Sequence, residues 1–174
     1  MDVIARVRAI LQSPRAEWSV IEREPDAPFD LYTRYVATLG AIPAVARFIG
    51  ESLVGGYTTM RWSFFGALFV YAATFAAVYL VAAVINELAP RFGVARNFSH
   101  ALKLSVYSYI PAWLAGIFLL VPGLSFLMLL GVYGVYLLWT GLPLLMRVRD
   151  EHAPAYVALV AACAIIPTVV LALT

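Results

Sequence analysis

Apolar residues run along this chain in long blocks, and short clusters of charged residues separate the blocks. The longest block extends from Tyr107 to Met146 and contains no Asp, Glu, Lys or Arg. An apolar run of about 20 residues suffices to cross the hydrocarbon core of a bilayer, which is about 30 Å thick. Pro122 and Gly123 interrupt this block, and both residue types end helices or allow a tight turn. We therefore predict a hairpin of two membrane-spanning helices; a buried helical pair of a soluble domain would need polar stripes that are absent.

The same pattern predicts further membrane-spanning helices on both sides of this hairpin. The predicted spans cover about residues 31–54, 64–88, 101–121, 124–146 and 154–173. The predicted fold class is therefore all-α, a polytopic integral membrane protein whose bundle of five transmembrane helices follows a short amphipathic segment. We predict a cytoplasmic amphipathic segment at residues 1–28 and a five-span membrane domain at residues 29–174.

The residues before the first span show the pattern of two short amphipathic helices. Five apolar residues between Val3 and Leu11 share one helical face, and Arg6 and Arg8 lie off it. A Ser-Pro pair at 13–14 restarts the helix, because Ser is a good N-cap and Pro is tolerated at the first helical position. A basic amphipathic segment with a tryptophan beside a span usually lies in the membrane interface, and partner binding is the alternative. The candidate residues are Arg6, Arg8, Arg15 and Trp18.

The basic residues are distributed unevenly over the two predicted sides of the membrane. The N-terminal segment, the loop at 89–100 with the entry to the third span, and the loop at 147–152 place nine of them on one side. The opposite side holds only Arg61, between the first two spans. Because basic residues favour the cytoplasmic side, we predict a cytoplasmic N-terminus and a C-terminus on the opposite side. The predicted location is the bacterial inner membrane.

Composition supports the membrane prediction and excludes several function classes. Hydrophobic residues make up 63% of the chain and charged residues 13%, whereas soluble domains carry about 25% charged residues. A net charge of +2 is too small to indicate nucleic-acid binding. The single Cys163 and the separated His100 and His152 do not form a metal-ligand pattern. We expect no enzyme activity, no metal and no cofactor.

Ionisable residues inside the predicted spans are candidate functional groups, because a charge at mid-bilayer costs about 2.5–3.5 kcal/mol on insertion scales. Arg47 and Glu51 lie four residues apart on one helical face and form either an interfacial ion pair or the lining of a polar cavity. Arg34 and Glu87 lie near the cytoplasmic ends of the first two spans, where a pair between them is geometrically possible. Arg47, Glu51, Arg34 and Glu87 are therefore the candidate polar membrane site.

Short stretches across nearly the whole chain match one family in their order and spacing. They are Ser13-Pro14 with Glu17-Trp18, Phe92-Gly93, Arg96-Asn97-Phe98, Ala101-Leu102-Lys103, residues 107–111, residues 113–116, residues 131–133, residues 136–138 and Gly141-Leu142. In these stretches the chain resembles the Yip domain family, which is named after Ypt/Rab-GTPase-interacting proteins. The hairpin motif of that family corresponds to Tyr107, Pro111, Gly116, Pro122, Gly131, Tyr133, Tyr136 and Gly141.

The resemblance implies five transmembrane helices with a cytoplasmic N-terminus, in agreement with the charge distribution. Eukaryotic relatives belong to the early secretory pathway and associate with Rab GTPases, with one another and with membrane-shaping partners. This chain lacks their long hydrophilic N-terminal region and resembles the compact prokaryotic members, so a Rab-type GTPase is not the expected partner. The family offers no established catalytic residues to transfer.

Two functional hypotheses from different classes follow. The first is a non-enzymatic membrane protein that organises the membrane or partner proteins through helix packing and its interfacial N-terminal segment. The alternative is a small transporter, channel or lipid scramblase with a polar site near Arg47 and Glu51. The expected partners are membrane lipids, a second copy of the chain or other membrane proteins, and not nucleic acid.

Overall fold

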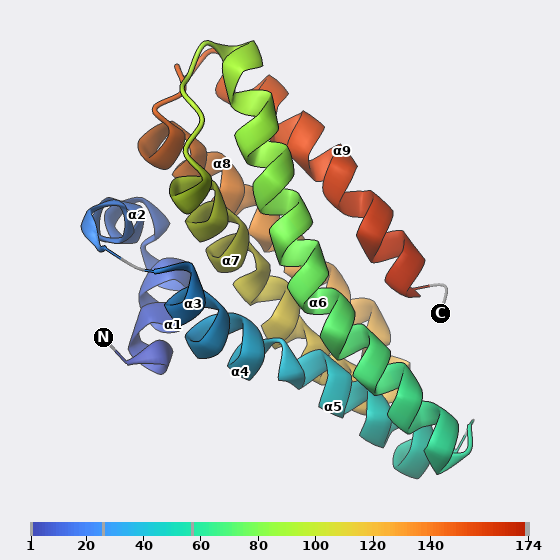
Figure 1. The fold of residues 1–174 in the computed structure, drawn as a ribbon. Helices are drawn as coiled ribbons and strands as arrows, with labels where there is room; N and C mark the ends of the chain where they lie inside the picture. Colours follow the sequence, from blue (N-terminus) through green and yellow to red (C-terminus); the bar gives the residue numbers. More distant parts are fainter. Residues whose placement is uncertain (1, 26, 57, 173–174) are drawn as a thin grey trace.

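The computed structural model describes residues 2–25, 27–56 and 58–172, with the side chains of the last helix described up to Ala164. All regular structure in these residues is helical (Figure 1). The elements are α1 Val3–Gln12, α2 Pro14–Arg23, α3 Pro28–Leu31, η1 Tyr32–Val36, α4 Ala37–Leu39, α5 Ala41–Ile49, η2 Gly50–Val54, α6 Met60–Leu88, η3 Ala89–Phe92, α7 Phe98–Ala115, η4 Gly116–Leu120, η5 Pro122–Val132, α8 Tyr133–Met146 and α9 Ala153–Ala172.

The first long helical segment runs without a break from α3 to η2. Pro28 lies in its first turn, where the missing N–H of proline costs nothing. Two π-helical stretches, η1 and η2, lie within it, and Gly56 follows in a left-handed conformation with φ of 62°. A Cβ on Gly56 would be strained by that φ value, so glycine lets the chain reverse toward α6.

α6 is the longest helix and continues through η3 to Phe92. Gly93 ends it in the left-handed conformation, with φ of 72°, as is usual after a helix C-terminus. After a short loop, the side chain of Asn97 caps α7 by accepting a hydrogen bond from the His100 N–H at 3.1 Å.

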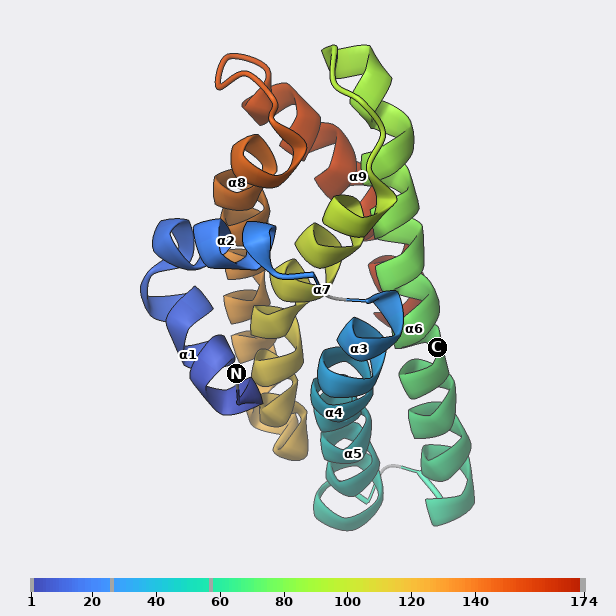
Figure 2. The same ribbon diagram turned by 60° about the vertical axis from the view of Figure 1, so that its left-hand side comes forward.

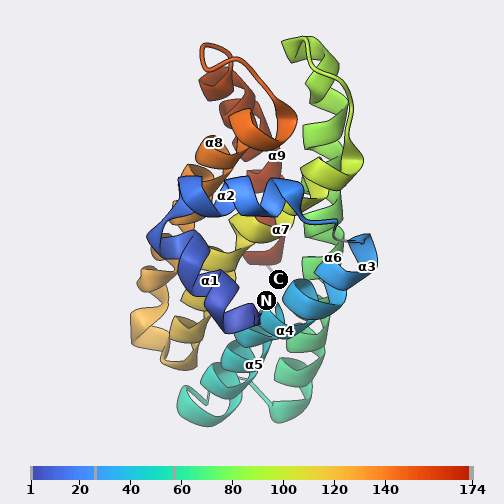
Figure 3. The ribbon, with the colours of Figure 1, turned by 90° about the vertical axis from the view of Figure 1, so that its left-hand side faces the viewer.

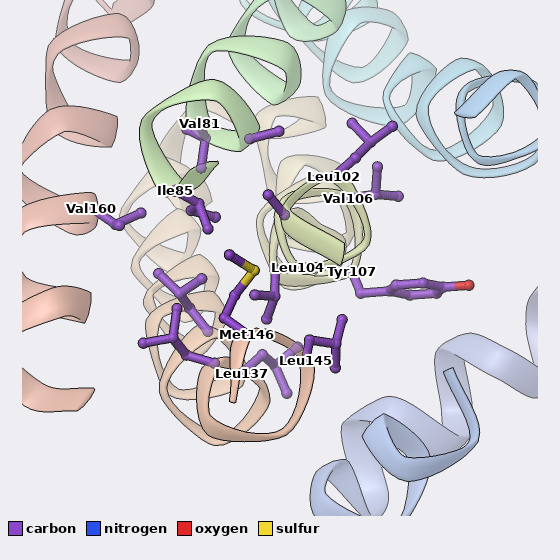
Figure 4. Packing of buried hydrophobic residues seen from close by; sticks show 14 of the residues in the cluster. Val81, Ile85, Leu102, Leu104, Val106, Tyr107, Leu137, Leu145, Met146 and Val160 are labelled. Atoms are coloured by element: carbon purple, nitrogen blue, oxygen red, sulfur yellow. The ribbon is translucent and has the colours of Figure 1, made fainter. Parts of the chain in front are cut away.

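α7 is the centre of the molecule, because it packs against both α6 and α8 and most of its residues are buried. Figure 4 shows Leu104 of α7 facing Leu137 and Met146 of α8, with Ile85 of α6 and Val160 of α9 completing the same cluster. Tyr107 points away from this cluster, toward the N-terminal helices (Figure 4). One side of α7 therefore packs in the bundle core, and another side is available to the N-terminal segment.

The predicted break in the long apolar block is confirmed. Val121 is extended, with φ of −119° and ψ of 108°, and Pro122 begins the next helical segment. The two sides of the hairpin are 3₁₀-helical near the turn, in η4 and η5, and become α-helical further from it. The chain therefore reverses with almost no protruding loop.

Four stretches of the described residues are long and apolar enough to cross a membrane: Pro28–Val54, Met60–Phe92, Phe98–Leu120 and Pro122–Met146. They match the first four predicted spans, and their ends differ from the predicted ends by at most four residues. The fifth predicted span, 154–173, corresponds to α9. The part of α9 with described side chains, Ala153–Ala164, is an apolar helix shorter than a span.

α9 starts near the η3 end of α6 and diverges from α6 toward its own C-terminal end (Figure 1). Its 20 residues correspond to about 30 Å of helix, enough in length for one crossing. The fifth crossing, and with it the placement of the two termini on opposite sides, stays a prediction.

α1 and α2 form a bent pair that lies across the long helices rather than parallel to them (Figures 2 and 3). The predicted break between the two helices at Ser13 is confirmed, with Pro14 in the first turn of α2. We call residues 3–23 the N-terminal hairpin. Ile10, Trp18 and Ile21 of this hairpin belong to the same buried cluster as the residues of α6, α7 and α8.

Candidate functional site

Trp18 anchors the N-terminal hairpin to α8. Its side chain is fully buried, and its Nε1–H donates a hydrogen bond to Thr140 Oγ1 at 3.3 Å. A Cβ built on Gly141 would lie 2.5 Å from Trp18 Cε2, so only glycine leaves room for the indole there. Trp18 also meets Tyr107 of α7 edge-on, at 5.9 Å between ring centroids. The indole of Trp18 is therefore not exposed to the membrane interface, because the ring fills a socket between α7 and α8.

Arg6 is the second buried anchor, with only 2% of its surface exposed. Its guanidinium donates hydrogen bonds to Glu17 of α2 and to Glu24 just after α2. Burial by itself lowers the pKa of Arg6, but the hydrogen bond to Glu24 and the charges of both carboxylates outweigh burial, and the net pKa is raised. Arg6 therefore stays charged and ties the two helices of the hairpin together.

The burial of Arg6 departs from the predicted pattern of α1. The predicted apolar face packs inward through Val3, Val7, Ile10 and Leu11, but Arg6, which was predicted to lie off that face, is buried as well. Ile4 of the predicted apolar face is 75% exposed. The two carboxylates that satisfy Arg6 lie 11 and 18 residues away, beyond the reach of helical periodicity within α1.

Lys103, the only lysine of the chain, reaches from α7 to the end of α2. Its Nζ donates hydrogen bonds to the backbone carbonyl of Ile21, at 2.8 Å, and to that of Glu24. The last carbonyls of a helix have no partner within the helix, so a cation placed there satisfies them and interacts favourably with the helix dipole. In the sequence analysis Lys103 contributes only to the topology; the signal for its role is a single lysine about one and a half turns inside an apolar helix.

The outer surface of the N-terminal hairpin is basic and partly apolar. Arg8, Arg15 and Arg23 are exposed, and Ile4 and Val20 are exposed beside them in the chain. The four candidate residues of the segment therefore divide into two classes. Arg6 and Trp18 are buried anchors, whereas Arg8 and Arg15 are exposed.

The glycines of the hairpin motif lie at close helix contacts. A Cβ on Gly116 would lie 2.5 Å from Pro43 Cβ of α5, and one on Gly131 would lie 3.0 Å from Ala112 Cα of α7. Together with Gly141 against Trp18, they let three different elements approach the hairpin of η4, η5 and α8. Small residues allow this close packing of helices in membranes.

The remaining motif residues connect this hairpin to the N-terminal part of the chain. The Tyr133 hydroxyl donates a hydrogen bond to the Leu11 carbonyl at 3.0 Å, which ties the end of α1 to the start of α8. Tyr107 lies 5.0 Å from Tyr35 between ring centroids, and Tyr136 packs against Tyr133. Pro111 is buried inside α7, and Pro122 begins η5.

The candidate polar membrane site is not one cluster. Arg47 Nε donates a hydrogen bond to Glu51 Oε1 at 2.6 Å, with the two side chains 22% and 30% exposed. This pair closes within the first long helix, as the four-residue spacing predicts. Glu87 instead accepts a hydrogen bond from Arg96, also at 2.6 Å, on the exposed surface. The pair between Arg34 and Glu87 that the sequence allowed is therefore not formed.

Arg34 is exposed and lies at a small cavity of ≈270 Å³ between the N-terminal hairpin and the first long helix. Arg6, Glu24 and Asp30 line the same cavity. Neither this cavity nor the larger one near His100, described below, is lined by Arg47 or Glu51. Among the residues that the structure describes, no three His, Cys, Asp or Glu side chains are grouped to hold a metal ion.

Comparison with known proteins identifies a family and its relatives. The inner membrane protein YohC of Escherichia coli, in strain K12 and in strain CFT073 of serotype O6:H1, is 27% identical to this chain over 165 residues. The alignment covers 88% of this chain and 85% of YohC. No solved structure shows significant similarity to the chain. The Yip1 domain matches residues 8–171, which include most of the N-terminal hairpin and all four long apolar spans, and the chain therefore belongs to the Yip1 domain family as an integral membrane protein.

Proposed function

We propose that this protein is a non-enzymatic membrane organiser, which binds partner proteins or the membrane surface through the outer face of its N-terminal hairpin. The observation that carries the proposal is the division of the hairpin into buried anchors and exposed arginines. Trp18 and the Ile21 carbonyl hold the hairpin on α8 and α7, and Arg6 ties its two helices together, so the exposed arginines lie on a fixed support.

The chemistry of this outer face suits an anionic surface. Exposed arginines beside exposed Ile4 and Val20 combine charge attraction with apolar contact, which is the combination that interfacial helices use. Juxtamembrane basic residues contribute about 1 kcal/mol each near an anionic membrane surface. A protein partner with acidic and apolar groups would meet the same surface features.

We place the protein in the bacterial inner membrane, with the N-terminal hairpin in the cytoplasm. The name of the relative YohC states an inner-membrane location for that protein. The uneven distribution of basic residues supports the orientation of this chain. Under this orientation, the N-terminal hairpin and the loops at 93–97 and 147–152 share the cytoplasmic side.

The transporter hypothesis has less support from the site. Arg47 and Glu51 satisfy each other within one helix, and neither of the two cavities described reaches them. An ion pair within one helix lowers the cost of burying both charges, but it does not form a path for a solute.

Site-specific photo-cross-linking in cells tests the proposed surface. A photoreactive group at Val20, which is exposed beside the arginines, should form discrete adducts with a protein or with lipid. The variant R8Q/R15Q should reduce these adducts. The variant R91Q/R149Q, which removes exposed arginines from η3 and from the loop at 147–152, serves as the matched control and should leave the adducts unchanged. Absence of adducts, or equal loss in both variants, would overturn the proposed surface.

A further inference from the structure

A second cavity, of ≈370 Å³, lies between the loop at 93–97, the start of α7 and the end of α8. Its lining residues include Arg96, His100 and Arg147, and no carboxylate is among the described residues that line it. Val94, Leu145 and Met146 supply an apolar part of the wall. The cavity is therefore basic on one part of its surface and apolar on another.

The position of the cavity relates it to the membrane boundary. Phe98 begins the third apolar span and Met146 ends the fourth, and the cavity lies beside both of these ends. The ends of spans are the level at which lipid headgroups meet the protein. Basic pockets between transmembrane helices on the cytoplasmic side are a known form of anionic headgroup site.

The fold holds one polar side chain of the cavity, that of His100, in place. His100 Nδ1 lies 2.7 Å from the Leu145 carbonyl, and it must be the donor because a carbonyl only accepts. This hydrogen bond fixes the imidazole against α8. The cavity also lies at the N-terminus of α7, where the positive end of the helix dipole favours an anion.

The two arginines have carboxylate partners outside the cavity wall. Arg96 pairs with Glu87 at 2.6 Å, and Arg147 lies 3.6 Å from Glu22 of α2. The Arg96–Glu87 pair and the Arg147 side chain are largely exposed, and exposed ion pairs contribute little stability. Rearrangement of either arginine toward an anion in the cavity therefore costs little, and a phosphate offers the paired oxygens that arginine prefers.

We propose that this cavity is a binding site for the phosphate group of an anionic membrane lipid. Arg96 and Arg147 contact the phosphate, and the apolar wall of Val94, Leu145 and Met146 accommodates the adjoining glycerol and the first part of the acyl chains. The proposal does not depend on what the outer face of the hairpin binds.

Native mass spectrometry of the delipidated full-length protein with phosphatidylglycerol, and with phosphatidylcholine as the neutral reference, tests the site. The variant R96Q/R147Q is expected to bind phosphatidylglycerol roughly 30-fold more weakly than the wild type, because it removes two basic contacts. The control R91Q/R149Q removes the same charge from the same end of the molecule, at residues outside the cavity wall. It is expected to bind as the wild type does. Equal losses in the two variants, or equal binding of both lipids by the wild type, would overturn the proposal.

Inorganic phosphate distinguishes a lipid from a soluble ligand. If the lipid is the ligand, inorganic phosphate should compete only weakly, because it lacks the contacts with the apolar wall. Competition by inorganic phosphate as strong as that by phosphatidylglycerol would overturn the lipid assignment in favour of a free anion. Thermal unfolding of each variant in detergent confirms that the fold is kept, because all four arginines are exposed.

Discussion

At the residue scale, the docking of the N-terminal hairpin depends on a contact between a glycine, Gly141, and a tryptophan, Trp18. Gly141 lets α8 pass directly under the indole of Trp18, and Leu104 of α7 closes the same space 2.8 Å from the position of a Cβ at 141. Interiors packed at this density accept added atoms only by moving a neighbour. Any side chain at this position must therefore displace Trp18 or separate α7 from α8.

The variant G141V should loosen this contact and destabilise the protein by about 1–3 kcal/mol, the usual cost of overpacking. Thermal unfolding in detergent measures the loss. Gly66 of α6 provides the matched control, because a Cβ there meets nothing within 4 Å, so G66V should unfold near the wild-type temperature. The variant G141V/W18F should recover part of the loss, since a smaller ring leaves space for the new methyl groups. Equal stability of G141V and the wild type would contradict the proposed socket.

At the scale of the elements, α2 is a helix held at its C-terminal end by another helix. Its last carbonyls accept hydrogen bonds from Lys103 of α7, and Glu24 just beyond it accepts from Arg6 of α1. A ten-residue helix is too short to be stable alone in water, so these contacts and the burial of Trp18 keep it formed. The position of α2 is therefore set by contacts with α1, α7 and α8 rather than by its own sequence.

Replacing Lys103 by methionine should release the end of α2 while keeping the apolar packing of α7. The expected result is faster cleavage by trypsin after Arg23, which is exposed at that end, with the membrane bundle left intact. Time courses of limited proteolysis measure the rate. The variant K103R keeps a cationic donor at the position and should be cleaved more slowly than K103M. Unchanged cleavage in K103M would show that Lys103 does not hold α2.

At the scale of the whole molecule, the N-terminal hairpin and the long helices share one buried cluster. Ile10, Trp18 and Ile21 lie in the same core as Leu104 and Leu137. Removing the hairpin would expose the socket on α7 and α8, and it would leave Glu24 without its partner Arg6. Substitutions on its outer face, such as those at Arg8 and Arg15, therefore separate binding from folding better than a deletion does.

The proposed organiser should give no protein-dependent flux of small solutes or fluorescent lipids in reconstituted liposomes, because Arg47 and Glu51 pair within one helix. Flux of each class is measured against empty liposomes, with the protein shown to be folded. Flux above that background, abolished by R47A or E51Q, would favour the transporter hypothesis and give the pair a role in transport.

The sequence predicted the features that depend on neighbouring residues. Apolar block length predicts the four long spans, Pro122 and Gly123 predict the turn of the hairpin, and four-residue spacing predicts the Arg47–Glu51 pair. The family resemblance is also confirmed by the Yip1 domain match.

Features that depend on distant residues were not predictable in the same way. The socket of Trp18 is formed by residues of α7 and α8 that lie more than 80 positions later, and the partner of Glu87 lies in the loop at 93–97 rather than on the first span. The burial of Arg6 likewise depends on carboxylates in a different helix. Periodicity identifies which residues share a helical face, but it does not identify the element that covers that face.

The socket of Trp18 also affects the order in which the chain assembles during synthesis. Thr140 lies 122 residues after Trp18, and at synthesis rates of about 5–20 residues per second the ribosome needs roughly 6–24 s to reach it. During that interval α2 has no α8 to dock on, so its indole and its arginines are all uncovered at the membrane surface. The newly made N-terminal segment therefore exposes Trp18 until α8 is synthesised, and docking of the hairpin on α8 is a late step of assembly.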